Sequence, residues 1–333
     1  MSVVYVTEDG SALRKTGERL LVSVNREQRL DVPMRQVEQI VLFGPASVSG
    51  RTVSELLDQR VGLTYLTKRG RYLGRLEPIT SRNPLLRRSQ YGAACDPERS
   101  AAVTEAIVRG KLVNQRALLQ RAHRSNPDEA VKAAIESIRD EGKAVRADDG
   151  VEVIRGHEGA AAAAYFGVFD HLIRADGFTF GKRIRRPPTD PVNSLLSLGY
   201  TLLFGDVLSA VQTVGLDPCM GFLHDDRQGR PSLALDLMEE FRPLIVDSLV
   251  LTVINKHILG VDDFDTEIGG AVILCNDARK RFLVEYENRI NTEVKHPQAG
   301  YRVTYRRACE IQARILGRHL MGELPNYVPL TTR

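Results

Sequence analysis

The chain has 333 residues, of which 43% are hydrophobic and 26% charged, and its formal net charge at pH 7 is +4. This balance excludes a chain that is disordered or of low complexity throughout. The length allows two domains, each with a core of its own. The mild positive charge permits a polyanionic partner such as nucleic acid without requiring one.

The cysteines and the apolar stretches bear on the compartment. Cys95, Cys219, Cys275 and Cys309 are far apart and form no CxxC pair, so neither a disulfide framework nor a zinc knuckle is expected. The N-terminal residues MSVVYVTEDG lack the basic and apolar regions of a signal peptide. Apolar stretches such as 248–254 are too short to span a bilayer. We therefore expect a cytoplasmic protein without a membrane partner.

The N-terminal part of the chain is rich in short apolar and β-branched segments, which predict strands where turn residues separate them. These segments lie at 3–6, 19–24, 37–43, 63–66 and 72–76. A short helix is expected at 52–59. Together they predict a small β-rich domain over residues 1–80.

Helical periodicity dominates the rest of the chain. The segment PITSRNPLLRRSQ contains two prolines and little periodicity, so a linker is expected at 81–96. From Pro97 onward apolar residues recur at helical spacing, behind Asp96 as a helix cap. Helices are expected at 101–121, 128–139, 151–174, 190–214, 233–257, 277–290 and 304–321. The expected fold class is α+β: a small β-rich N-terminal domain joined to a larger all-α domain at 97–333.

Several common catalytic motifs are absent from the sequence. No GxxxxGK[ST] motif occurs, which argues against a P-loop nucleotidase. His157 and Glu158 do not begin an HExxH motif, because position 161 is Ala161. No GxSxG motif occurs, which argues against a serine hydrolase elbow.

Glu158 precedes a run of small side chains in the segment GHEGAAAAAYFGVFDHLI. Alanine is the best helix former, so one interpretation is a well-packed helix that carries an exposed glutamate. In the other interpretation, the small side chains allow neighbouring helices and a substrate backbone to approach Glu158. The residues of this segment alone do not decide between the two.

A second acidic group follows His224 in the segment GFLHDDRQGRPSLALDLMEEFRPLIVD. Asp236 and Glu239 are three positions apart on an expected helix, so they share a face on which their like charges repel. Either a bound cation or arginines such as Arg242 would compensate that repulsion. Carboxylates with a neutral imidazole suit Mg²⁺ or Mn²⁺ better than zinc or copper. Such an ion would polarise a phosphoryl oxygen.

Basic residues cluster in two places. One cluster lies within 68–88, and the other consists of Lys182, Arg183, Arg185 and Arg186. A single basic run is usually a solvated loop. Two such runs in a chain with a candidate metal site favour phosphate binding.

Four segments, in this order and spacing, resemble the integrases of CRISPR adaptation, the "Cas one" family, and the resemblance covers the whole chain. The segments are HEGAAAAAYF, RIRRPPTDPVNSLLSLGYTLL, GFLH and SLALDLMEEFRPLIVD. The resemblance implies that Glu158, His224 and Glu239 bind the metal and that Asp236 belongs to the same catalytic group. Whether Asp236 or Glu239 is the direct ligand stays open. The residues expected to contact DNA are Arg183, Arg185, Arg186, Tyr165 and Asn193.

The resemblance also implies a reaction and partners. Prespacer DNA with free 3′-OH ends would be joined to a CRISPR repeat, each 3′-OH attacking a phosphodiester. The β-rich domains would form a homodimer, and two homodimers would bind the small "Cas two" subunit in a heterohexamer. The proline-containing tail at 324–333 is interpreted as a docking segment for a partner.

Two alternatives remain beside this interpretation. The first is a metal-dependent DNA nuclease that acts in repair. The second is a non-catalytic DNA-binding scaffold whose carboxylates only bond arginines. Strand transfer into a repeat-bearing plasmid distinguishes the first, and titration with Mn²⁺ distinguishes the second.

Overall fold

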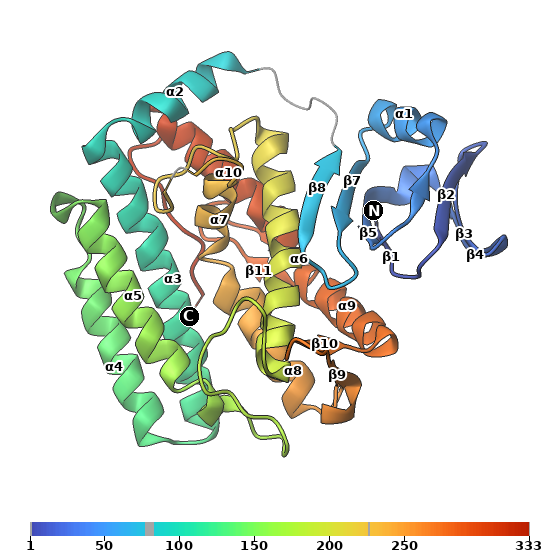
Figure 1. The fold of residues 1–333 in the computed structure, drawn as a ribbon. Helices are drawn as coiled ribbons and strands as arrows, with labels where there is room; N and C mark the ends of the chain where they lie inside the picture. Colours follow the sequence, from blue (N-terminus) through green and yellow to red (C-terminus); the bar gives the residue numbers. More distant parts are fainter. Residues whose placement is uncertain (1, 77–82, 226, 333) are drawn as a thin grey trace. The chain divides into compact units, whose positions relative to one another are not determined.

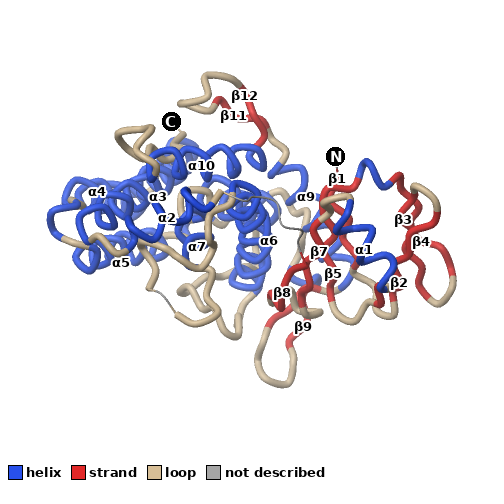
Figure 2. The backbone as a smooth tube through the Cα atoms, turned by 90° about the horizontal axis from the view of Figure 1, so that it is seen from above, coloured by secondary structure: helices blue, strands red, loops and turns tan. Residues whose placement is uncertain are grey.

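The computed structural model describes residues 2–76, 83–225 and 227–332. The chain divides into two compact units, Met1–Arg82 and Asn83–Arg333. The first is rich in strands and the second is mainly helical, as Figure 2 shows by colour. The expected α+β class is therefore confirmed. Residues 77–82, which belong to the basic run at 68–88 and to the start of the expected linker, lie outside the described residues.

The described residues of the first unit, 2–76, form two four-stranded sheets and one α-helix. In one sheet the order is β1-β5-β7-β8, with parallel pairs except for β7 and β8. In the other the order is β4-β3-β2-β6, with antiparallel pairs except for β2 and β6. The elements are β1 (Ser2–Val6), β2 (Ser11–Thr16), β3 (Arg19–Val24), β4 (Glu27–Pro33), β5 (Val37–Phe43), β6 (Ser47–Val48), α1 (Gly50–Asp58), β7 (Gly62–Leu66) and β8 (Tyr72–Leu76).

The strands that the sequence predicted are the more buried ones of this unit, and the strands that it missed carry more charged residues. The expected strand at 37–43 corresponds to β5, which is buried at every position except Glu38 and pairs on both sides. Strands β2 and β4 were not expected, because charged residues such as Arg14 and Arg29 interrupt their apolar pattern. Both belong to the second sheet, where β4 is an edge strand.

The second unit consists of helices with two short hairpins. Helices α3, α4 and α5 lie side by side (Figure 1). The helices are α2 (Pro84–Ala94), α3 (Pro97–Ser125), α4 (Glu129–Ala144), α5 (Val151–Gly167), α6 (Pro191–Val214), α7 (Ser232–Met238), α8 (Ser248–Asn255), α9 (Asn276–Ile290) and α10 (Tyr305–Leu320). The hairpins are β9 (Phe264–Thr266) with β10 (Val272–Leu274), and β11 (Glu293–Lys295) with β12 (Arg302–Thr304). These hairpins lie in the part of the chain for which the sequence pattern predicts helices alone.

Several expected boundaries differ from the structure; the helix expected at 151–174, for example, ends at Gly167 as α5. The expected linker at 81–96 contains α2, because Asn83 caps this helix through the N–H groups of Leu85 and Leu86, and Pro84 occupies its first turn. The long helix expected at 233–257 is interrupted after α7 and continues as a π-helical turn, Pro243–Asp247, before α8. Pro243 lacks the N–H that an uninterrupted helix needs.

By length and composition alone, helix α6 could cross a membrane. No apolar stretch of that length was expected from the sequence. However, 72% of its most apolar window is buried inside the protein. Within the second unit it packs against α7, α8 and α10. A core helix of a globular unit has this combination of apolar composition and burial.

Candidate active site

Three helices of the second unit bring an acid–base cluster together. Lys111 of α3 donates a hydrogen bond to Glu158 of α5, and its Nζ lies 2.7 Å from Oε2 of Glu239, the residue that follows α7. An Nη atom of Arg242 lies 3.1 Å from the other oxygen of Glu239. The side chain of Glu239 is 5% exposed and that of Glu158 is 25% exposed. Of the two acids, Glu158 is therefore the more open to solvent.

Asp236 organises the segment that carries His224. Its Oδ2 accepts hydrogen bonds from the backbone N–H groups of Phe222 and Leu223, at 2.6 and 3.0 Å. Its Oδ1 accepts from the backbone N–H of His224 at 3.0 Å and lies 2.6 Å from Nδ1 of the same residue. Gly221 allows this close approach, since a Cβ there would lie 2.8 Å from Oδ2 of Asp236.

The same segment is attached to the helix that carries Glu158. Arg155, one turn before Glu158 on α5, donates from Nε to the backbone oxygen of Leu223 at 2.6 Å. Its Nη1 also pairs with Asp225 at 2.5 Å. The position of His224 relative to Glu158 is therefore set by Arg155 as well as by Asp236.

These bonds separate the roles of the two acids that the sequence analysis left open. A carboxylate has about four lone-pair positions, and the contacts of Asp236 use all of them in a site where it is fully buried. Because an ionised carboxylate only accepts, the proton of the neutral His224 imidazole lies on Nδ1, and in that form Nε2 has a free lone pair. Nε2 lies 3.9 Å from Oε1 of Glu239. The geometry favours Glu239 over Asp236 as a direct ligand.

Glu239 is a buried acid that stays ionised. Burial alone would raise its pKa, but the nearby charges, Arg242 first and then Lys111, outweigh burial and lower the pKa to about 2. Its Oε2 is buried without a hydrogen bond of good geometry, although Lys111 lies close to it. Such an orphaned anionic oxygen is suited to a cation.

The donor types of the cluster fit a divalent ion that prefers oxygen with one imidazole nitrogen, namely Glu158, Glu239 and Nε2 of His224. The described residues nevertheless contain no group of three His, Cys, Asp or Glu side chains close enough to hold a metal as they stand. Two of the candidate ligands, Glu158 and Glu239, are instead bridged by the ammonium of Lys111. The ligand types are present, and a cationic side chain occupies the space between two of them.

A network of aromatic and acidic side chains supports Arg242. Its guanidinium lies 4.7 Å from the centre of the Tyr200 ring, a distance typical of a cation–π contact. Tyr200 and Tyr165 both donate to the buried Asp247, at 2.5 and 2.8 Å. Burial raises the pKa of Asp247 to about 6, against the two tyrosine bonds and the charges of Arg242 and Arg183. The Tyr200 ring therefore contacts the guanidinium of Arg242, which also pairs with Glu239.

The residues expected to contact DNA fall into two groups. Tyr165 and Asn193 are fully buried, so they lie beneath the surface that DNA would reach, and their contact with DNA stays a prediction. Arg183 donates to Asn193 at 2.7 Å and to Ser197 at 3.1 Å, and it holds its loop on α6. The exposed residues of the expected set are Arg185 and Arg186.

The C-terminal tail docks on its own chain. Tyr327 donates to Glu240 at 2.7 Å, and the N–H of Leu330 donates to the same carboxylate. Asn114 of α3 donates to the backbone oxygen of Leu330 at 2.8 Å. A Cβ on Gly110 would lie 2.5 Å from Pro329, so this glycine gives the tail room against α3. The described part of the tail is therefore anchored on its own chain, and its docking on a partner stays a prediction.

Removing residues 324–333 should lower the free energy of unfolding by on the order of 4 kcal/mol. The truncation exposes the cavities of the buried Tyr327 and Leu330 and removes two donors from Glu240, which keeps only Gln312 among the described residues. Urea denaturation followed by circular dichroism measures the change. Val328→Ala is the control, because this tail side chain is exposed. Unchanged stability together with capture of a partner by the tail would support docking on a partner.

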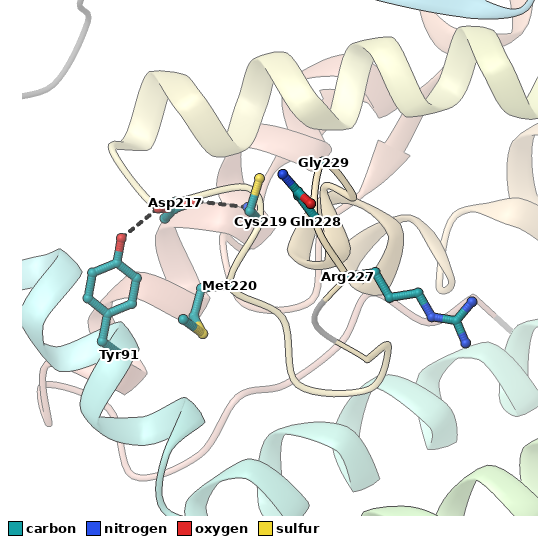
Figure 3. A pocket seen from close by; sticks show the side chains of 7 residues that line it. All are labelled: Tyr91, Asp217, Cys219, Met220, Arg227, Gln228 and Gly229. Carbon is teal, nitrogen blue, oxygen red and sulfur yellow. Dashed lines mark hydrogen bonds between the residues drawn. The ribbon is translucent and has the colours of Figure 1, made fainter.

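A shallow pocket lies beside the segment that leads to His224, and it does not include the acid–base cluster (Figure 3). Tyr91 of α2 donates to Asp217 at 2.6 Å, and the N–H of Cys219 donates to the same carboxylate at 2.8 Å. Met220 and Arg227 complete much of the lining. These contacts attach α2 to the segment that follows α6.

Comparisons with known proteins define the class of this fold and site. The family model described as CRISPR associated protein Cas1 matches residues 4–288. A protein of Chlorobaculum tepidum named CRISPR-associated endonuclease Cas1 1 is 40% identical, and the match covers 100% of this chain and 99% of that protein. The chain therefore belongs to the CRISPR-associated Cas1 family.

Two solved structures share the fold. A casposase bound to its integration product has a TM-score of 0.85 at 23% identity, covering 98% of this chain and 93% of that one. A chain of a Cas6-RT-Cas1–Cas2 complex has a TM-score of 0.82 at 24% identity, covering 99% of this chain and 36% of that one.

Proposed function

We propose that this protein is a metal-dependent DNA endonuclease and integrase that inserts prespacer DNA into a CRISPR array in the cytoplasm. The observation that carries the proposal is the preset geometry of His224, whose Nδ1 is bound by Asp236 while Nε2 faces Glu239. A carboxylate behind an imidazole is the usual support of a histidine ligand. Family membership and the endonuclease relative support a nucleic-acid substrate, which we propose is DNA.

Glu158, His224 and Glu239 would hold Mg²⁺ or Mn²⁺. When bound, the ion supplies positive charge at the phosphate under attack. Asp236 keeps the lone pair of Nε2 directed at the site, and Arg242 balances the second oxygen of Glu239. The exposed Arg185 and Arg186 would contact the DNA backbone, which sets its position and not its sequence.

Partners follow from the same proposal. The β-rich unit would form a homodimer, and two homodimers would assemble with the small Cas2 subunit in a heterohexamer. The Cas6-RT-Cas1–Cas2 complex contains a chain of this fold and supports such an assembly. The DNA partners would be the double-stranded prespacer and the CRISPR repeat, as the casposase with its integration product supports for the fold.

The test is strand transfer of a short duplex with free 3′-OH ends into a repeat-bearing plasmid, with Mn²⁺ and the Cas2 subunit. The wild type should form joined products, and His224→Ala and Glu158→Ala should form none. Glu136→Ala is the matched control, since Glu136 is exposed on the neighbouring helix α4. Metal-dependent nicking without joining would favour a nuclease of repair, and equal products from all variants would exclude this site.

A further inference from the structure

Lys111 is a buried cation at the centre of the proposed metal site, and the reaction as proposed assigns it no role. Its side chain is 10% exposed and lies on α3 between the buried residues Gly110 and Leu112. Its ammonium binds Glu158 of α5 and lies 2.7 Å from Glu239 after α7. It therefore contacts both acids that are proposed to bind the ion.

Compensation of the charge on Glu239 does not by itself account for the position of Lys111 between the two glutamates. Burying an ammonium is unfavourable unless carboxylates compensate it, and the pairs with Glu158 and Glu239 do so. Glu239, however, already has a cationic partner in Arg242, at 3.1 Å from its other oxygen. Two glutamates thus face two cationic side chains, so the charges of both proposed metal ligands are compensated before any ion binds, while the further negative charge of Asp236 is bonded to His224 and the backbone.

The charge balance has a consequence for the ion. A divalent cation added beside Lys111 and Arg242, where both glutamates are already compensated, meets electrostatic repulsion from these two side chains in a partly buried site. The ion also needs the glutamate oxygens that the ammonium contacts. A DNA phosphate supplies negative charge at the same place, so it would relieve the repulsion and attract the displaced ammonium.

We propose that Lys111 is a resident cation that competes with the divalent ion for Glu158 and Glu239, and that DNA relieves this competition by binding the displaced ammonium. The proposal rests on the proposed metal role of these two glutamates. Lys111 is then a residue that couples metal binding to DNA binding. Without DNA the site holds its own cation, and with DNA it takes the divalent ion.

Calorimetric titration of the full chain with Mn²⁺, without DNA, tests the competition. Lys111→Gln should bind Mn²⁺ about tenfold more tightly than the wild type, a coupling of ordinary size. Lys111→Arg keeps the charge and should stay as weak as the wild type. Lys132→Gln on α4 is the control, because Lys132 is exposed and pairs only with Glu129 among the described residues.

A second measurement keeps the test decisive if Lys111→Gln folds too poorly for calorimetric titration. The rise in Tm on addition of Mn²⁺ should be larger for Lys111→Gln than for the wild type. Addition of a short duplex should tighten Mn²⁺ binding by about tenfold for the wild type and by less for Lys111→Gln. Equal Mn²⁺ affinity of Lys111→Gln and wild type, or an equal effect of the duplex on both, overturns the role of Lys111.

The outcomes separate this inference from the proposed function. If the wild type binds Mn²⁺ and Glu239→Ala does not, the proposed metal site is supported. The Mn²⁺ affinity of Lys111→Gln then decides whether Lys111 competes with the ion. Where neither the wild type nor Lys111→Gln binds millimolar Mn²⁺ with or without DNA, the metal centre fails and the competition fails with it.

Discussion

Glu239→Gln should lower metal-dependent DNA cleavage and strand transfer by at least about 10³-fold while the protein stays folded and binds DNA. The amide has the size of the carboxylate but lacks the charge that a divalent ion needs. Glu239 is the acid with an orphaned oxygen and the neighbour of Nε2 of His224. Cleavage of a labelled branched duplex in Mn²⁺ measures the rate, and a filter-binding assay measures the affinity for DNA.

Glu240→Gln is the matched control for this prediction, because it makes the same change at the next residue. Glu240 is also buried, but its carboxylate faces Tyr327, Gln312 and the N–H of Leu330 in the tail anchor. This variant should retain cleavage within about tenfold and lose stability, since an amide group then meets hydrogen-bond donors. Undiminished cleavage by Glu239→Gln would place the reaction at another group of residues.

The fold class was predictable from local patterns, and the departures have identifiable physical causes. Strands β5 and β7 are apolar on both faces or nearly so, and such runs predict strands without further information. Strands β2 and β4 are half polar, and their pairing with β3 depends on tertiary contacts. Pro84 was interpreted as a break although it begins a helix, because Asn83 caps that helix through two backbone N–H groups.

The candidate site was only partly visible in the sequence. Glu158, His224 and Glu239 lie in recognisable segments, and the spacing of Asp236 and Glu239 indicated a shared face. Lys111 was missed, although a lysine between the buried Gly110 and Leu112 of α3 is itself a signal. What the ammonium touches depends on how α3, α5 and α7 pack, and no periodicity within one helix carries that information.

The different surroundings of Asp236 and Glu239 could also be seen only in the structure. Both are acids on one helical face, and the sequence cannot tell which side chain turns towards the backbone of Phe222 and Leu223. The hydrogen bonds make the difference, since one acid is saturated by donors and the other is left with an orphaned oxygen. The burial of Tyr165 and Asn193 was hidden for the same reason, because polar side chains are usually exposed.

Asp236→Asn should lower both the stability of the protein and the affinity of its site for Mn²⁺. The amide nitrogen replaces one acceptor that serves two N–H donors, so the free energy of unfolding should fall by about 3 kcal/mol. His224 then loses the group that sets its tautomer and ring orientation. Loss of such support typically weakens a metal site by about 10- to 100-fold, which calorimetry measures on the folded protein.

Asp225→Asn tests whether any change in this segment has the same effect. Asp225 is exposed and pairs with Arg155 at its surface, so the variant should keep its Mn²⁺ affinity within about twofold. A double-mutant cycle with His224→Ala separates positioning from stability. If Asp236 acts through His224, Asp236→Asn should weaken Mn²⁺ binding much less once His224 is absent, because no imidazole remains to be oriented. Full additivity of the two losses in Mn²⁺ affinity would mean that Asp236 supports the site by another route, and the assignment of the free lone pair to Nε2 would no longer follow.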